Sequence, residues 1–389
     1  MDVLDDIQFY VMHCHHYAEI PPDDARFAST WVDMPNSVFD PARGHALYER
    51  YTREVRLIEE LGFDAIALNE HHNTPFSLMP SPSVRAGHVI ATTERIRIMV
   101  AGIPLNLSTP NRVAEEYAML DVMSGGRMEF GFPLGTGMEY WSNAAHTDPV
   151  SARARFREGL EVVLRAWTEP GPVRYEGEHF HYRYLNIWPR PFQQPHPRIY
   201  IMGSGSIETV DVAAEFGAGY SVVFTPIPQQ LKAFAALRER CAQRGRALAP
   251  DDIMITAMVY VAETDEQALR EAQPYITRFF SWFHRVPPRF MAPPGYVTRD
   301  NFERLATTAA LSGSHEASWE DMQAIGRIAV GSPETVADTL AHWAREAGSS
   351  RFMLNMAHAD MPEDMVAGNL TRFASEVIPR VRAQAEVPA

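Results

Sequence analysis

The stretch that decides the fold is Leu61-Gly62-Phe63-Asp64-Ala65-Ile66-Ala67-Leu68-Asn69-Glu70-His71-His72. Its apolar run, residues 65–68, ends abruptly in a carboxylate and two adjacent imidazoles. Parallel β/α enzymes place charged and titratable side chains where a buried strand ends. Histidine changes its protonation near neutral pH, so a histidine at such an edge can move protons. Taken alone, the pair also fits one histidine that caps the strand and one that faces solvent.

Eight apolar runs, this one included, have the length and continuity of parallel strands buried on both faces. They span residues 7–12, 65–68, 96–101, 128–132, 198–202, 220–224, 254–261 and 352–356. Between them lie amphipathic helical patterns at 48–61, 111–123, 155–167, 207–216, 229–244 and 333–347. This alternation predicts an α/β fold, a (β/α)8 TIM barrel with its site at the C-terminal face. A doubly wound open sheet is the structural alternative.

Two stretches interrupt the alternation within what we interpret as one barrel domain over residues 1–389. These insertions at the C-terminal face cover residues 136–197 and 262–330. The second is rich in proline and aromatic residues, among them Trp282, Phe283 and Phe290. Long insertions in barrel loops are often functional lids. We therefore expect a lid that excludes water from an apolar organic substrate, or equally an interface patch.

A glycine- and serine-rich segment, residues 201–209, follows the predicted fifth strand and opens a helix. Glycine lets the backbone approach a ligand, and the free N–H groups of a helix start favour an anion. A phosphate site is the functional interpretation, with candidates Gly203, Ser204, Gly205, Ser206 and Thr209. It is not the dinucleotide fingerprint, because Glu208 stands where the third glycine belongs. An ordinary turn with a capping serine is the alternative.

Small residues also end the predicted third strand, at Ala101 and Gly102. They leave room for a flat ligand to press on the backbone, although taken alone they are better explained by close packing of a helix on the strand. A metal hydrolase would draw on Glu70, His71 and His72, with His13 or His15 as a further ligand. No His-Glu-x-x-His spacing supports such a site, and we expect no metal.

Composition restricts the partners. The 389 residues carry a net charge of −14 without a long basic run, which argues against nucleic acid and anionic membranes. No apolar run approaches the length of a membrane helix, about 18 residues. Two cysteines are too few for a disulfide framework, and the acidic N-terminus lacks the layout of a signal peptide. We therefore expect a cytoplasmic protein.

Taken in order, several segments resemble the bacterial luciferase-like, flavin-dependent monooxygenase family. They are Leu61-Gly62-Phe63-Asp64 with Glu70-His71-His72, residues 110–116 with 120–127, residues 189–197, residues 213–217, residues 331–337 and residues 374–380. The insertions match least well. Pro133 and Leu134 stand where the light-emitting subunit has a cysteine and an arginine, so light emission is not implied.

The resemblance implies a barrel that binds reduced FMN, which reacts with O2 to a C4a-hydroperoxide that oxygenates the substrate. It implies that His71 transfers a proton near the flavin, with Glu70 and His72 orienting it. Asn69, Ala101 and Gly102 would contact the flavin, and the bond between Ala101 and Gly102 would be a non-prolyl cis peptide. Gly205, Ser206 and Thr209, with Gly203 and Ser204, would hold the phosphate.

The resemblance also implies a separate NAD(P)H:flavin reductase that supplies the reduced FMN, and a homodimer. Candidate dimer elements are Tyr51, Arg56 and the helix at 114–123, which could equally pack on the barrel. Two alternatives remain open. One is an F420-dependent oxidoreductase of the same superfamily, which transfers hydride without O2. The other is a non-catalytic flavin-binding subunit.

Overall fold

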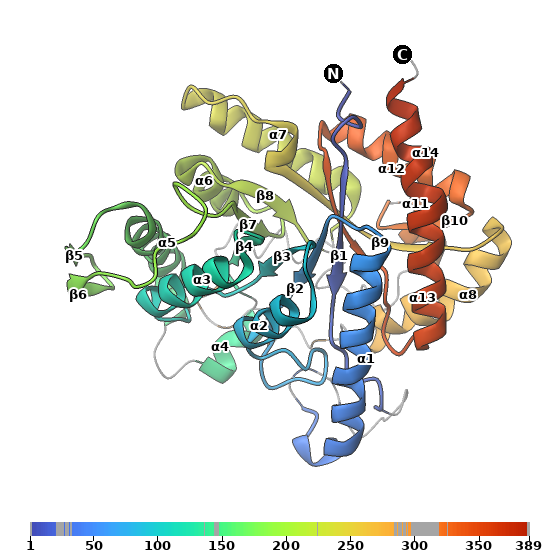
Figure 1. Cartoon of the computed structure of the whole chain (residues 1–389), viewed down its shortest axis with the longest axis horizontal. Coiled ribbons are helices and arrows are strands. Elements are labelled where there is room, and N and C mark those ends of the chain that lie inside the picture. The colour runs from blue at the N-terminus through green and yellow to red at the C-terminus, as the bar shows by residue number, and fades with distance from the viewer. Residues whose placement is uncertain are drawn as a thin grey trace.

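The computed structural model describes residues 2–20, 27, 31, 33–135, 137–143, 148–223, 225–283, 286, 290, 293, 295–296, 319–324 and 326–386. Eight parallel strands form a closed barrel at its centre (Figure 1). In order around the barrel they are β1 (Gln8–His13), β2 (Ala65–Leu68), β3 (Arg97–Ala101), β4 (Met128–Pro133), β7 (Ile199–Gly203), β8 (Gly219–Val222), β9 (Ile253–Val261) and β11 (Arg351–Asn355). The barrel closes because β9 pairs with both β8 and β11.

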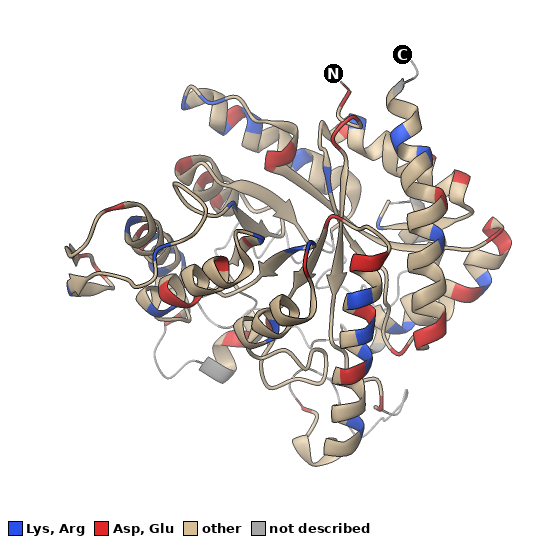
Figure 2. Ribbon diagram, in the orientation of Figure 1, with Lys and Arg blue, Asp and Glu red and all other residues tan. Residues whose placement is uncertain are grey.

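Helices cover the outside of the barrel, and Figure 2 shows that most charged residues lie on these helices and on loops. The long ones are α1 (Pro41–Glu60), α2 (Pro82–Thr92), α3 (Pro110–Ser124), α5 (Ala152–Thr168), α6 (Ile207–Phe216), α7 (Ile227–Gln243), α8 (Asp265–Arg278), α12 (Pro333–Ala347) and α13 (Glu363–Arg372), with the shorter α14 (Ile378–Ala383) at the end. Within the described ranges, no helix is long and apolar enough to cross a membrane.

The predicted barrel is confirmed, and each of the eight predicted strands occurs within one or two residues of its expected bounds. Closure of the sheet rules out the open-sheet alternative. A ninth strand, β10 (Ile328–Gly331), pairs in parallel with the C-terminal half of β9. The prediction missed it because three of its four residues lie inside the stretch that we interpreted as a lid.

Local signals in the sequence fix both ends of α1 and the start of β2. The Asp40 side chain accepts a hydrogen bond from the backbone N–H of Ala42 at 2.8 Å, and Pro41 occupies the first helical position. At the other end Gly62 adopts a φ of +80°, which favours glycine. The chain turns there directly into β2, so the capped helix places the residues that follow this strand at the barrel mouth.

Alternate residues of the strands fill the barrel interior, and methionine dominates them. The cluster consists of Tyr10, Met12, Cys14, Ala65, Ala67, Met99, Tyr200, Met202, Met254 and Met353. At the N-terminal end of the barrel the Tyr10 hydroxyl donates to Glu129 at 2.9 Å, and Arg97 pairs with Glu129 at 3.2 Å. This polar closure lies opposite the site face, where barrels keep their stabilising contacts.

The stretch between β4 and β7 is more structured than the single predicted helix. It holds α4 (Gly137–Asn143), α5, and an antiparallel hairpin of β5 (Val173–Glu176) and β6 (His181–Leu185) at the periphery of the molecule (Figure 1).

The stretch between β9 and β10 contains α8, a π-helical segment (Phe279–Phe283) and α11 (Trp319–Ala324). Of the predicted lid residues, Phe290 is half-buried and its ring contacts that of Trp141 with centroids 5.6 Å apart. The side chains of Trp282 and Phe283 lie outside what the structure describes, so the lid remains a prediction.

Candidate active site

His71 lies just past the end of β2, in an aromatic niche at the barrel mouth. Its imidazole meets the rings of Trp31 and Phe76 edge to face, with centroids 4.7 and 5.0 Å away. Its backbone N–H donates to the Met79 carbonyl at 3.3 Å, which fixes the loop. The side chain keeps 17% of its surface exposed, so the niche holds the ring without closing it off.

A carboxylate from another element contacts this imidazole. Oε1 of Glu139, on α4, lies 3.3 Å from His71 Nδ1, and the Glu139 side chain is buried. Within the described ranges no hydrogen bond uses His71 Nε2, so that nitrogen can face a ligand. A carboxylate on one ring nitrogen selects the tautomer and orients the other nitrogen, which is the usual arrangement of a histidine that moves protons.

Glu70 orients a different histidine from the one expected. Its Oε1 lies 2.8 Å from Nε2 of His72, and this ion pair is separate from His71. The hydrogen bond of Glu70 therefore goes to His72 rather than to His71, and an orienting role of Glu70 and His72 toward His71 stays a prediction. Glu139 is the carboxylate that contacts the His71 ring. It lies in the insertion, where the sequence carried no signal linking it to His71.

The pair has pKa shifts that follow from burial and contact. Desolvation raises the pKa of Glu70, and His72 opposes that rise only in part. The hydrogen bond to Glu70 raises the pKa of His72, although desolvation opposes it. Because the His72 pKa is raised, the stability that His72 gains from this contact is fully present below the unfolded histidine pKa of about 6.5. That contribution is lost as the pH rises through the folded value.

Glu70→Gln is expected to return the pKa of His72 toward its ordinary value, because the amide keeps a hydrogen-bond acceptor but removes the charge. A histidine NMR titration measures this shift, with His72→Gln identifying the resonance. The pH dependence of stability should flatten above about pH 6.5 in the variant. An unchanged His72 titration in Glu70→Gln would contradict the assigned ion pair.

Asn69, His13 at the end of β1 and His15 just after it are all buried, unlike the partly exposed His71. The Asn69 amide donates to Cys14 Sγ at 3.6 Å and accepts from the Ser77 hydroxyl at 3.1 Å. His13 contacts Glu54 at 2.7 Å and His15 at 3.1 Å, and both rings are buried. Among the described residues, no group of three or more His, Cys, Asp or Glu is arranged to hold a metal ion.

The end of β3 is shaped by close contact with β4. A Cβ on Gly102 would lie 2.1 Å from the Gly131 carbonyl oxygen and 2.7 Å from that of Val100. The small residue is thus needed for strand-to-strand packing, rather than for the helix packing considered from the sequence. Across the described residues the cis peptides all precede proline, so the expected cis bond between Ala101 and Gly102 is wrong. The trans bond follows a regular strand end, where Ala101 pairs with Gly131.

The predicted phosphate segment forms the turn from β7 into α6. Gly205 has a φ of +85°, and the Ser206 hydroxyl caps the helix by accepting from the Thr209 N–H at 3.4 Å. The Thr209 hydroxyl contacts the Ser206 carbonyl at 2.9 Å and the Tyr220 hydroxyl at 2.7 Å. A Cβ on Gly203 would lie 2.8 Å from each of those hydroxyl oxygens, Thr209 Oγ1 and Tyr220 Oη.

This turn contains the capping serine that the sequence also suggested, while the phosphate role of the segment stays a prediction. Because Thr209 and the next residue already bond to Ser206, the start of α6 retains backbone N–H groups that point out of the helix. Glu208 adds a negative charge there, and Arg153 on α5 lies 3.9 Å from its carboxylate. Ser204 is exposed, so its hydroxyl is accessible from solvent.

The strand order brings these pieces to one rim. Leu68 at the end of β2 pairs with Val100 on β3, and β4 separates β3 from β7. Residues 69–72, 101–102 and 203–206 therefore follow strands in the same half of the barrel, all at the C-terminal face. A flat ligand with a phosphate tail can span this rim, with its ring near β2 and β3 and its phosphate at α6.

Comparison with known proteins identifies the family. The profile of the luciferase-like monooxygenases matches residues 34–351. The chain is 28% identical to an uncharacterised protein, y4wF, of Sinorhizobium fredii, over 87% of this chain and 94% of that protein. It is 24% identical to the oxygenase component of a flavin-dependent trigonelline monooxygenase of Acinetobacter baylyi, over 66% of this chain and 71% of the relative.

Solved structures agree on the fold. The monooxygenase RslO1 of Streptomyces bottropensis superposes with a TM-score of 0.74, at 22% identity, over 96% of this chain and 99% of that one. The oxygenating constituent of 3,6-diketocamphane monooxygenase of Pseudomonas putida, in complex with FMN, gives 0.74 at 17% identity, over 97% and 99%. With a barrel of this kind and a family profile that covers most of its length, the chain belongs to the luciferase-like monooxygenase family.

Proposed function

We propose that the protein is the oxygenase component of a two-component monooxygenase. It takes reduced FMN from a separate NAD(P)H:flavin reductase and uses O2 to oxygenate a small organic substrate. The observation that carries the proposal is the His71 imidazole, held by Glu139 and two aromatic rings at the rim that a flavin can span. The relative from Acinetobacter baylyi, named an oxygenase component, supports the two-component arrangement.

The residues at the rim fit FMN. Gly205 in its left-handed conformation and the start of α6 make a cradle for the phosphate, and Ser206 adds a hydroxyl. Ala101, which is half-buried at the end of β3, carries only a methyl group and would leave room for a flat ring above it. When bound, reduced FMN supplies the electrons that activate O2, a chemistry for which amino-acid side chains alone are not suited.

His71 would hold or move a proton at Nε2, the nitrogen that faces the rim. Glu139 would keep the other nitrogen, Nδ1, oriented and would stabilise the protonated imidazole. Trp31 and Phe76 would exclude water from one side of the ring, which strengthens electrostatic contacts there. The aromatic niche would thus exclude water from His71, as the predicted lid would exclude water from the substrate.

A stopped-flow experiment tests the function. Protein with anaerobically reduced FMN is mixed with oxygenated buffer, and absorbance is recorded until the flavin is oxidised. We expect a transient spectrum distinct from both reduced and oxidised FMN, which lives longer than in a protein-free control. Reoxidation at the rate of free flavin, with no transient, would contradict the proposal. Titration with F420 would then separate the oxidoreductase alternative from a non-catalytic subunit.

We also propose a homodimer formed through α2 and α3. Their outer faces expose Val84, Met119, Val122 and Met123, with 55% of Met123 accessible. Tyr51, expected as an interface residue, is buried and stacks on His15 at 4.4 Å, so it packs between α1 and the segment that follows β1. Sedimentation equilibrium is expected to give about twice the 43.8 kDa of one chain. Met123→Glu should shift the mass toward the monomer, and a monomeric wild type would refute the dimer.

A further inference from the structure

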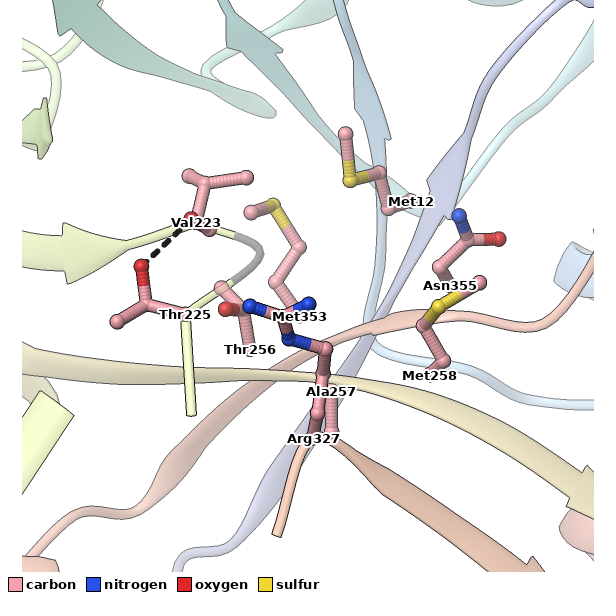
Figure 3. A pocket seen from close by; sticks show the side chains of 9 residues that line it. All are labelled: Met12, Val223, Thr225, Thr256, Ala257, Met258, Arg327, Met353 and Asn355. Atoms are coloured by element: carbon pink, nitrogen blue, oxygen red, sulfur yellow. Dashed lines mark hydrogen bonds between the residues drawn. The ribbon is translucent and has the colours of Figure 1, made fainter. Parts of the chain in front are cut away.

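A small cavity opens at the barrel mouth beside the rim already described. Its volume is only about 10 Å³, room for roughly one water molecule, so a larger ligand requires its walls to move. Its lining residues belong to β1, β9 and β11, follow β8, or directly precede β10. They are Met12, Val223, Thr225, Thr256, Ala257, Met258, Arg327, Met353 and Asn355 (Figure 3). The Val223 N–H donates to the Gly203 carbonyl at 3.0 Å, so the cavity adjoins the phosphate segment.

Arg327 places its guanidinium at this cavity, and no acidic side chain among the described residues pairs with it. Its guanidinium lies over the Phe280 ring, 5.1 Å from the centroid, and in the described part of the chain no carboxylate pairs with it. Its Nε is buried and makes no hydrogen bond within the same ranges. Burial lowers the pKa of Arg327 with no opposing carboxylate. Nearby Arg278, by contrast, is paired with Asp360. Arg327 as a whole is half-buried, but its Nε is removed from water without an acceptor, and an anion would supply one.

Asn355 adds a second group that lacks a partner. It lies at the end of β11, is 1% exposed, and neither its Oδ1 nor its Nδ2 has a hydrogen bond among the described residues. The hydroxyls of Thr225 and Thr256 are already committed as donors to the Val223 and Val222 carbonyls. The amide and guanidinium N–H groups are therefore the donors that remain for a ligand.

The remaining walls are apolar and adaptable. Met12, Met258 and Met353 present flexible thioether side chains, which can move to admit a larger group. Figure 3 shows the Arg327 guanidinium turned toward Thr256 and Thr225, with Asn355 and Met12 on the other side of the space. A carboxylate between these two sides could accept from the guanidinium on one side and the amide on the other, with the thioethers around the apolar body that carries it.

We propose that Arg327 and Asn355 bind the carboxylate of an apolar organic acid, which is the substrate of this enzyme. The inference rests on the proposed function, because it names the substrate class for the same barrel mouth. The methionine walls would hold the body of the acid, and the adjoining rim at Gly203 would hold the flavin. An anion could also be the flavin phosphate, but the helix start that suits it follows β7, outside the cavity lining.

Calorimetric titration of the full-length, flavin-free protein tests the proposal with two matched probes. Cyclohexanecarboxylate carries the anion, and cyclohexanecarboxamide is its neutral isostere. We expect wild type to bind the carboxylate at least about tenfold more tightly than the amide. Arg327→Gln should abolish this preference while binding the amide within about twofold of wild type. Arg174→Gln, an exposed arginine on the β5–β6 hairpin, is the control and should keep the preference.

The outcomes separate the possible roles. Equal affinity of wild type for the two probes, or an unchanged preference in Arg327→Gln, would overturn the inference. A loss of FMN affinity in Arg327→Gln with the carboxylate preference intact would assign the arginine to the flavin phosphate, and would overturn it too. Asn355→Leu provides a second variant, expected to weaken carboxylate binding alone, should Arg327→Gln fold poorly. Because the probe titration uses flavin-free protein and measures binding alone, a failed stopped-flow test stays distinguishable from a failed binding test.

Discussion

His71→Ala is expected to lower the rate of substrate oxygenation about 100-fold or more, the usual contribution of a positioned acid or base. The variant removes the imidazole between Trp31 and Phe76 and leaves the Glu139 carboxylate without its histidine partner. FMN should still bind, because the phosphate segment on α6 and the small residues of β3 are untouched. Single-turnover product yield and stopped-flow reoxidation rates, measured on the same preparation, separate the lost chemistry from lost binding.

His342→Gln is the matched control for this substitution. It removes an exposed histidine on α12, which pairs with Glu346 of the same helix at 3.6 Å, far in sequence from the site. We expect the control to keep the wild-type rate. If His71→Ala oxygenated substrate as fast as wild type, the proton-transfer role of His71 would be wrong, and the niche would be structural.

Gly102→Ala is expected to destabilise the protein by about 3 kcal/mol or more, at or beyond the upper end for overpacked sites. Its Cβ would lie 2.1 Å from the Gly131 oxygen and 2.7 Å from the Val100 oxygen. Both obstacles are backbone atoms of barrel strands, so no side chain can rotate away to relieve the contact. β3 would have to separate from β4, and FMN affinity should fall together with stability. Urea unfolding and flavin fluorescence titration measure the two effects.

Gly87→Ala provides the comparison, because the same methyl group is added where space is open. Gly87 lies inside α2, and nothing lies within 4 Å of its ideal Cβ position. Alanine in a helix interior is favoured over glycine by about 0.5–1 kcal/mol, so this variant should be slightly more stable. A Gly102→Ala protein as stable as wild type would mean that β3 and β4 can separate at no cost.

The barrel strands could be predicted because each is a continuous apolar run buried on both faces, a pattern that few other structures produce. The run at 65–68 became β2 with the predicted bounds, and the helix at 207–216 became α6. β10 was missed because its pattern, Ile-Ala-Val-Gly, is short and lies within an irregular region. Its pairing with β9 depends on the tertiary fold, which no local signal reports.

The candidate site was predictable where it follows a strand and obscure where an insertion supplies the partner. His71 and Ser206 lie at strand ends, and the sequence marks both. Glu139 reaches His71 from α4, 68 residues along the chain, and Arg327 reaches the cavity from just before β10. Neither residue belongs to a motif, so only the closed barrel reveals what each one contacts.

The methionine lining of the barrel would limit how long the protein stays active under the proposed reaction. Met12 and Met353 lie both in the barrel interior and on the wall of the Arg327 cavity. Hydrogen peroxide released whenever O2 is consumed without product would meet these thioethers before it reached solvent. Oxidation to the sulfoxide would make an apolar wall polar. Under the proposed function, turnover without substrate would thereby inactivate the enzyme from inside, at side chains that are buried in the folded protein.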